Sequence, residues 1–257
     1  MADAAEAFVT VCDCRTLVRR GGTGEPVLFL HGAGGFPGWQ PFLAQLADRY
    51  DVMAPDHPGY GQSDYPHWLE EVADLAQFYL EFLKSCDLHG VQVIGHSLGG
   101  WIALEMATRS TARIKSVTVL SSAGIRVKGH GPPDLFAMDP EELVRALYHD
   151  QSLIEQQLST PPTPEQLATM TRNRTTSARL GWNPRFFNPK LRKWLRRIDV
   201  PTHIIWGEQD KIFVPAYANE LQNEIAGAKV TMIPDTGHML LVEKADAVAD
   251  AVVAFSG

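Results

Sequence analysis

The chain has 257 residues, a length that a single α/β domain often fills. Asp and Glu number 30 against 23 Lys and Arg, which gives a formal net charge of −7 at pH 7. A mildly acidic surface favours solubility and argues against general binding to nucleic acid or to anionic membranes, so we expect neither as a partner.

Short, continuous apolar runs bounded by turn residues recur along the chain, a pattern typical of strands buried on both faces of a sheet. Helix-like segments separate these runs. The predicted strands are 27–30, 52–55, 91–95, 116–120, 202–206 and 229–233, and the predicted helices are 41–49, 69–86, 98–109, 216–224 and 242–255. Repeated alternation of strand and helix predicts an α/β fold with a mostly parallel central sheet and helices on both faces.

The alternation breaks once, from Arg126 to Arg197, where no buried strand is evident. Proline clusters, helix-like pieces and scattered apolar residues fill this stretch, which favours a helical insertion over a disordered linker. We therefore expect an α/β core domain over residues 1–125 and 198–257. A helical cap, or lid, is expected over residues 126–197.

The segment GHSLGG, residues 95–100, follows a predicted buried strand and opens a predicted helix. It is a G-x-S-x-G motif in the required context of strand, turn and helix. A turn this sharp strains the serine backbone, so the neighbouring residues must lack side chains that would collide. The Ser97 hydroxyl is thereby expected at the carboxyl edge of the sheet, beside the free N–H groups of a helix N-terminus.

This turn resembles the nucleophile elbow of the α/β-hydrolase superfamily. The resemblance extends strand by strand over almost the whole chain, and the cap region is the least similar part. It implies a catalytic triad in which serine, acid and histidine follow one another along the chain, without a cofactor or a metal.

A serine hydroxyl is a weak nucleophile and needs a general base that titrates near neutral pH, which indicates a histidine. His238 follows the last predicted strand, at the same sheet edge as Ser97, and is expected to exchange a proton with it. Asp210 follows the preceding strand and matches the acid position of the superfamily, with Glu208 as the nearest rival. Taken singly, each residue could be a helix cap or a polar loop residue. Their order and their common edge favour a triad.

The loop HGAGG, residues 31–35, resembles the H-G-x-G loop that supplies half of the oxyanion hole in this superfamily. Fixed N–H donors stabilise the negative charge that acyl transfer places on the former carbonyl oxygen. The resemblance implies the backbone N–H groups of Leu98 and Ala33 as donors, with Gly34 as a possible substitute. His31 is expected to brace the loop, and His57 is not expected to act as a second base.

Residue types around the triad separate the subfamilies. Haloalkane dehalogenases and epoxide hydrolases carry aspartate at the nucleophile position, so Ser97 argues against both. Hydrolases that cleave C–C bonds of ring-cleavage products often carry Asn before the serine and Trp after the histidine, where this chain has His96 and Met239. The favoured expectation is hydrolysis of a small carboxylic ester or lactone through an acyl-enzyme on Ser97. C–C bond hydrolysis, cofactor-free perhydrolase or haloperoxidase activity, and a non-catalytic ligand receptor on the same fold stay open.

The predicted cap carries twelve Lys and Arg against seven Asp and Glu. One hypothesis is that a substrate carboxylate is bound by some of Arg172, Arg174, Arg179 and Arg185. The favoured alternative places these arginines on solvated helix faces or pairs them with the acidic core domain. Candidates for an apolar pocket lining, which core packing explains equally well, are Trp182, Phe186, Phe187 and Met239.

The cysteines and the first residues bear on the compartment. Cys12 and Cys14 are predicted to lie on one strand and to point to the same face, a poor geometry for a disulfide. The first six residues are acidic with no long apolar run, and no stretch of the sequence is long and apolar enough to cross a bilayer. We therefore expect a cytoplasmic protein with reduced thiols, whose oligomeric state the sequence leaves open.

Overall fold

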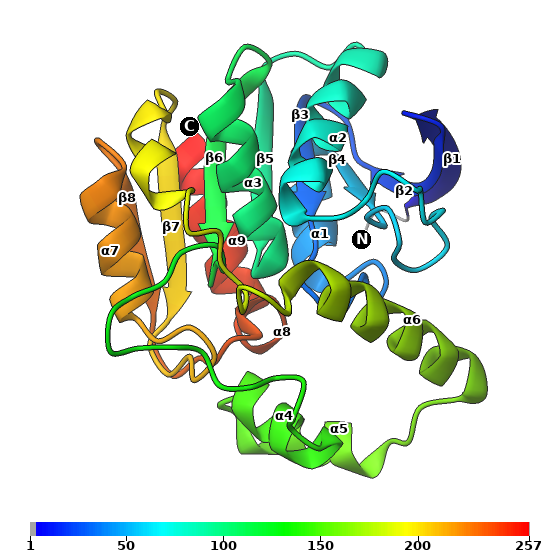
Figure 1. The fold of residues 1–257 in the computed structure, drawn as a ribbon, viewed down its shortest axis with the longest axis vertical. Helices are drawn as coiled ribbons and strands as arrows, with labels where there is room; N and C mark the ends of the chain where they lie inside the picture. The colour runs from blue at the N-terminus through cyan, green and yellow to red at the C-terminus, as the bar shows by residue number, and fades with distance from the viewer. Residues whose placement is uncertain (1–3, 257) are drawn as a thin grey trace.

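The computed structural model describes residues 4–256, which form an eight-stranded sheet between two layers of helices (Figure 1). The strands are β1 (Ala5–Val11), β2 (Cys14–Gly21), β3 (Glu25–Leu30), β4 (Tyr50–Pro55), β5 (Val91–His96), β6 (Ile114–Leu120), β7 (Thr202–Gly207) and β8 (Lys229–Ile233). Their order across the sheet is β1-β2-β4-β3-β5-β6-β7-β8. Pairing is parallel from β4 to β8 and antiparallel where β2 meets β1 and β4. The prediction of a mostly parallel sheet is confirmed.

The N-terminal hairpin corrects one prediction. Cys12 and Cys14 do not share a strand, because β1 ends at Val11 and β2 begins at Cys14. Cys12 and Asp13 form the turn between them, with φ angles of 50° and 56°. Two left-handed residues in a two-residue turn match the twist of the flanking strands. Cys12 is consequently exposed and Cys14 buried, and both are free thiols.

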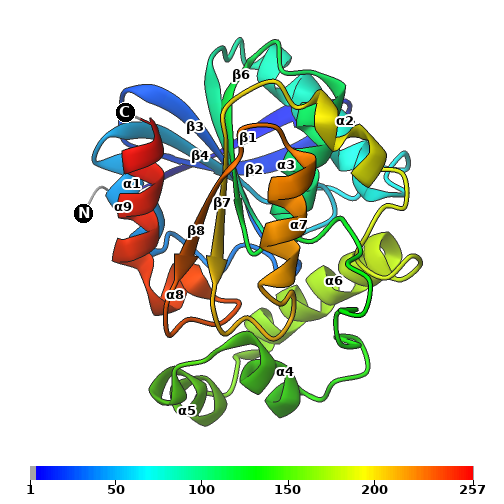
Figure 2. The ribbon, with the colours of Figure 1, turned by 90° about the vertical axis from the view of Figure 1, so that its left-hand side faces the viewer.

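Helices cover both faces of the sheet (Figure 2). They are α1 (Pro41–Ala47), α2 (Val72–Ser85), α3 (Leu98–Arg109), α7 (Ala216–Glu224), α8 (Leu240–Glu243) and α9 (Ala245–Ser256). Helices α1 and α9 lie on one face, and α2, α3 and α7 on the other. Every residue of β5 and β7 is buried, as double coverage requires. Among residues 4–256, no helix combines the length and apolar character needed to span a bilayer.

Between β6 and β7 the chain leaves the sheet. We call residues 126–197 of this connection the cap. It contains α4 (Pro140–Leu147), α5 (Gln151–Ser159), α6 (Pro164–Gly181) and the 3-10 helix η1 (Arg192–Arg197). Both views place α6 across the end of the sheet to which the parallel strands point, with α4 and α5 farther from the sheet. The cap helices therefore lie over the edge at which the predicted site residues emerge.

Candidate active site

Ser97 occupies the sharp turn between β5 and α3, with φ of 53° and ψ of −112°. A left-handed backbone is unfavourable for a residue with a side chain, so this turn is strained. Glycines make it possible, because a Cβ on Gly95 would overlap the Gly99 carbonyl and one on Gly99 would overlap the Leu30 carbonyl. Ser97 stands at the helix N-cap position, yet its side chain makes no capping bond. Its hydroxyl is directed elsewhere.

Three polar side chains from separate loops meet at this edge. Ser97 Oγ lies 3.0 Å from His238 Nε2, and His238 Nδ1 lies 2.9 Å from Asp210 Oδ2. All three residues are buried, with exposed fractions of 8 % for Ser97 and 3 % for each of the others. With the proton of the imidazole on Nδ1, Nδ1–H donates to the carboxylate and Nε2 accepts from the serine hydroxyl. That tautomer is the one a general base requires.

Main-chain donors hold the Asp210 carboxylate in place. Its Oδ1 accepts hydrogen bonds from the backbone N–H groups of Ile212, at 2.8 Å, and of Phe213, at 3.0 Å. The second oxygen, Oδ2, is thereby presented to His238. Glu208, the rival acid in the sequence, is exposed. The geometry therefore selects Asp210 as the partner of the histidine.

His96, next to Ser97, supports the loop of His238. Its Nε2 lies 3.0 Å from the carbonyl oxygen of His238, so Nε2–H donates to that carbonyl. Burial lowers the pKa of His96 to about 3, and the nearby His238 adds to this effect. His96 is therefore neutral near pH 7. It positions the main chain of His238 through a hydrogen bond and contributes no charge to the site.

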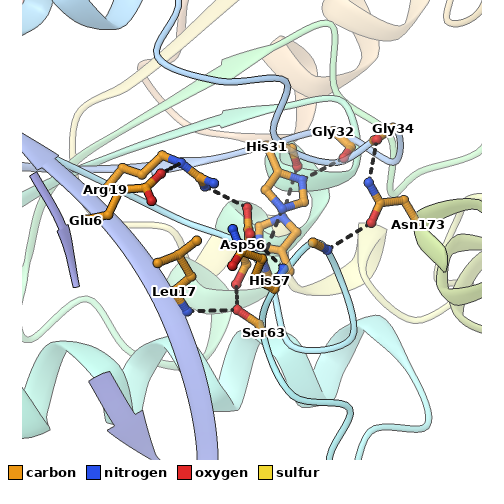
Figure 3. Close-up of polar contacts among 12 residues, drawn as sticks. Glu6, Leu17, Arg19, His31, Gly32, Gly34, Asp56, His57, Ser63 and Asn173 are labelled. Carbon is orange, nitrogen blue, oxygen red and sulfur yellow. Dashed lines mark hydrogen bonds and ion pairs between the residues drawn. The ribbon is translucent and has the colours of Figure 1, made fainter. Parts of the chain in front are cut away.

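The loop at residues 31–35 lies beside Ser97, since a Cβ on Gly32 would come within 3.3 Å of Ser97 Cβ. His31 Nδ1 donates to the Gly32 carbonyl at 2.8 Å (Figure 3). Gly35 N–H donates to the same oxygen at 3.0 Å. The N–H and C=O of a trans peptide point in opposite directions. Two bonds on Gly32 O therefore fix the direction of Ala33 N–H, one of the predicted donors. The other predicted donor, Leu98 N–H, belongs to the first turn of α3.

Two stacked, neutral histidines, His31 and His57, stabilise the conformation of this loop. The rings of His31 and His57 lie 3.7 Å apart between centroids, and His31 Nε2 accepts from the His57 backbone N–H. Burial lowers the pKa of His31 to about 4 and holds that of His57 well below its ordinary value. His57 also contacts the Tyr79 hydroxyl and the His31 carbonyl through its two ring nitrogens. These are the contacts of a scaffold residue.

The four cap arginines singled out in the sequence all contact other protein groups. Arg172 donates to the carbonyls of Gly59 and Ser63, and Arg185 forms an ion pair with Asp134. The other two are Arg174, which donates to the Phe136 carbonyl, and Arg179, whose guanidinium lies 4.7 Å from the Tyr65 ring centroid. Each arginine thus contributes to the packing of the cap.

The predicted pocket-lining residues lie in different environments. Phe186 is buried, whereas Trp182 is 54 % exposed and, with Phe136, lines a groove of about 580 Å³ along α6. Met239 is half-buried, and its N–H donates to the Leu147 carbonyl of the cap. Within residues 4–256, no three His, Cys, Asp or Glu residues are grouped so that they could hold a metal ion.

Glu243 is a neighbour of the site that the sequence did not reveal. Its Oε1 accepts from Gly237 N–H at 2.9 Å, and its Oε2 accepts from the N–H groups of His149 and Asp150 at 2.9 and 2.8 Å. One carboxylate therefore joins the loop of His238 to the start of α5. A single glutamate near the start of a predicted helix carries no signal of such a role.

A parallel sheet with a strained serine turn and a buried Ser–His–Asp row defines a hydrolase-type α/β protein. The model of the alpha/beta hydrolase family matches residues 27–251, and the chain belongs to that family. It is 31 % identical to the dihydrolipoyllysine-residue acetyltransferase component of the acetoin cleaving system of Cupriavidus necator, over 95 % of this chain and 67 % of that protein.

One further relative supports the assignment, and one solved structure shares the fold. The chain is 26 % identical to 2-hydroxy-6-oxo-6-(2'-aminophenyl)hexa-2,4-dienoic acid hydrolase of Metapseudomonas resinovorans, over 97 % of this chain and 90 % of that protein. Its fold matches that of naproxen esterase from Bacillus subtilis with a TM-score of 0.79 at 20 % identity, over 100 % of this chain and 92 % of that one. The predictions of the superfamily, the fold and an α/β-hydrolase enzyme are confirmed.

Proposed function

We propose that the protein is a serine hydrolase that cleaves a small carboxylic ester or lactone through an acyl-enzyme on Ser97. The observation that carries this proposal is the chain of two hydrogen bonds that links the buried side chains of Ser97, His238 and Asp210. Such an arrangement activates a hydroxyl, because the imidazole accepts its proton while the carboxylate orients the ring and stabilises its charged form.

In the proposed reaction, Ser97 Oγ attacks the acyl carbon while its proton passes to His238 Nε2. The tetrahedral intermediate collapses, the leaving alkoxide takes that proton from His238, and an ester of Ser97 is left. Water then attacks the acyl-enzyme as His238 accepts its proton. Return of this proton to Ser97 Oγ releases the carboxylic acid and restores the enzyme.

Two backbone donors complete the proposed site. We propose that the backbone N–H groups of Leu98 and Ala33 donate hydrogen bonds to the oxyanion. The N–H group of Gly34 is the alternative to that of Ala33. The fixed peptide of Ala33 supports this assignment, since a donor that is already oriented needs no rearrangement as charge develops. Loss of one such donor typically raises the barrier by about 3 kcal/mol.

C–C bond hydrolysis is the second candidate, because one relative is named as a hydrolase of a hexa-2,4-dienoic acid. The difference at His96 and Met239 from the residues common in such enzymes favours ester hydrolysis. A non-catalytic receptor is disfavoured by a row of side chains poised for proton transfer.

Hydrolysis of p-nitrophenyl esters, from acetate to octanoate, tests the proposal. We expect turnover of the short esters and a loss of at least about 10³-fold in kcat/KM for Ser97→Ala. A fluorophosphonate probe should add covalently to Ser97 in the wild type, as mass spectrometry of peptides would show. Turnover that survives unchanged in Ser97→Ala would exclude this nucleophile. A ring-cleavage dienoate cleaved in preference to every ester would favour the second candidate.

A further inference from the structure

One face of α6 presents polar side chains to the core instead of to solvent. Asn173, Thr176 and Ser177 recur at helical spacing and are each at most 4 % exposed. Buried polar groups require hydrogen-bond partners. All three find them in two loops of the core, and the partners are mostly main-chain atoms.

Two of these side chains bind the loop at residues 31–35. Ser177 Oγ donates to the Ala33 carbonyl at 2.7 Å. Asn173 Nδ2 donates to the Gly34 carbonyl at 2.9 Å (Figure 3). The Tyr60 hydroxyl lies 2.8 Å from Ser177 Oγ and can donate to it, because the serine proton is committed to Ala33. The cap thus holds the loop that carries the proposed oxyanion donors.

The same face of α6 binds the loop at residues 57–64. Asn173 Oδ1 accepts from Gly61 N–H at 2.9 Å, so one amide bridges the two loops. Thr176 Oγ1 donates to the Gly59 carbonyl at 2.8 Å, and Arg172 donates to the same oxygen. Thr176 therefore lies on the buried face, but its hydroxyl does not bond to residues 31–35, which we call the oxyanion loop.

Glycines in both loops allow this close approach. Gly35 has φ of 90°, and a Cβ there would overlap the Asn173 amide. Gly59 has φ of 87°, and a Cβ there would come within 2.8 Å of Thr176 Cγ2. Left-handed φ angles favour glycine. At both positions the absence of a Cβ also leaves room for the side chains of α6.

Anchored carbonyls orient the N–H groups on the opposite side of each peptide. Ser177 holds Ala33 O, which fixes the direction of Gly34 N–H, and Gly32 O is held by His31 and Gly35. Asn173 holds the next carbonyl, that of Gly34. Three consecutive peptides are therefore fixed, two of them by the cap.

We propose that Ser177 and Asn173 are positioning residues that keep the oxyanion loop in its working geometry. The catalytic consequence of this inference rests on the proposed function. Donors stabilise a developing charge best when they are held in place beforehand, so loss of an anchor lowers kcat more than it raises KM.

Adjacent residues of α6 supply a matched comparison. Ser177→Ala and Thr176→Val each remove one buried hydroxyl, but only Ser177 bonds the oxyanion loop. With p-nitrophenyl acetate we expect kcat to fall about tenfold in Ser177→Ala with KM within about twofold, and to stay within about twofold in Thr176→Val. Ser177→Thr, which keeps a hydroxyl, should restore most of the rate. Equal losses of kcat in the two variants would overturn the inference.

Hydrogen exchange measured by mass spectrometry tests the anchor without any substrate. Exchange in peptides covering residues 31–36 should be about fivefold faster in Ser177→Ala and unchanged in Thr176→Val. If Ser177→Ala does not fold, Asn173→Asp provides the same test, because it loses the donor to Gly34 O and keeps the acceptor for Gly61 N–H. Unchanged exchange in the folded variant overturns the inference even if esters are hydrolysed. Failure of Ser97-dependent turnover overturns the proposed function instead, and the exchange result still decides the anchor.

Discussion

The two parts of the cap, α6 and the α4–α5 pair, contact the core in different ways. Helix α6 buries polar side chains that bond to loop main chain, whereas every residue of α4 is at least partly exposed and Ile154 is the buried residue of α5. Hydrogen bonds fix distance and angle. Those of α6 lie along its buried face, whereas those of the α4–α5 pair cluster at Leu147, His149 and Asp150, where the two helices meet, so the exposed remainder of both helices is less constrained. A continuous insertion can therefore contain a fixed part and a loosely held part.

The loosely held part contacts the core near the histidine. The Glu243 carboxylate binds the N-terminus of α5, and Met239 N–H donates to Leu147 O at the end of α4. The fixed part instead contacts the oxyanion loop through Asn173 and Ser177. We infer that displacement of α4 and α5 would affect the base, whereas displacement of α6 would affect the donors. The two halves of the proposed machinery thus depend on different halves of the cap.

Acid should have the largest effect on stability, because it protonates buried histidines on both sides of the site, His31 in the oxyanion loop and His96 beside the His238 loop. His31 is the first residue of the oxyanion loop, and burial lowers its pKa from 6.5 to about 4. Unfolded histidines bind protons below about pH 6.5, so between pH 6.5 and 4 the unfolded state binds more protons than the folded state. The free energy of unfolding is therefore undiminished above pH 6.5 and falls as the pH decreases. His31 alone accounts for a loss of about 3 kcal/mol by pH 4.

Urea denaturation at several pH values from 7 to 4 measures this loss. His203 is a useful reference, because burial also lowers its pKa to about 4 and it lies on β7, where its Nε2 contacts Thr231. His203→Gln should reduce the acid-induced loss without abolishing it. A free energy of unfolding that does not change between pH 6.5 and 4 would contradict the buried, neutral state of His31.

Asn173→Leu should have the next largest effect. It removes both bonds of the amide and leaves Gly34 O and Gly61 N–H without that partner, at a cost of about 2–4 kcal/mol in the free energy of unfolding. The matched change on the exposed surface of α5 is Gln156→Leu, which should alter stability by less than about 0.5 kcal/mol. Chemical denaturation of both variants compares the two parts of the cap directly. Equal costs would remove the distinction between them.

The sequence allows the position of the candidate site to be predicted because each residue of the expected triad lies in the turn or short loop that follows a parallel strand. Ser97, Asp210 and His238 emerge from β5, β7 and β8 at one edge, so strand order alone brings them close together. The Cys12–Asp13 turn was missed, because neither residue belongs to the Asn-Gly or Asp-Gly pairs that usually mark such a hairpin.

The polar face of α6 could not be predicted for a physical reason. The run TRNRTTSAR, residues 171–179, has the composition of a solvated helix, and its buried members bond to main-chain atoms more than 100 residues away. Main-chain partners leave no trace in side-chain patterns. Glu243 escaped notice for the same reason, since its three donors are backbone N–H groups.

Glu243→Gln tests the contact between the core and the α4–α5 pair, the counterpart of the contacts made by α6. The amide oxygen of Gln can replace one carboxylate oxygen but not both, so either Gly237 or the start of α5 loses its acceptor. We expect a loss of about 1–2 kcal/mol in stability and faster hydrogen exchange in residues 147–155. Exchange in residues 31–36 should not change. Glu208→Gln, on an exposed residue near Asp210, is the control.

The smallest expected effect concerns Arg185, a candidate ligand for a substrate carboxylate. Its guanidinium pairs with Asp134 and lies 4.5 Å from the ring centroid of Trp182, so its contacts are satisfied within the cap. An exposed ion pair of this kind contributes about 0–1 kcal/mol. Arg185→Ala should therefore change kcat/KM by less than about twofold for neutral p-nitrophenyl butyrate and for the anionic p-nitrophenyl glutarate alike.

Arg192→Ala provides the matched control for that measurement, because Arg192 is also a half-exposed cap arginine in ion pairs, with Glu220 and Glu224. A loss confined to the anionic ester in Arg185→Ala, and absent in Arg192→Ala, would mean that the guanidinium leaves Asp134 when substrate binds. The residues that follow α6 would then recognise substrate charge, and the cap would contribute to specificity as well as to the geometry of the oxyanion loop. Equal behaviour of the two esters would exclude Arg185 from the recognition of substrate charge.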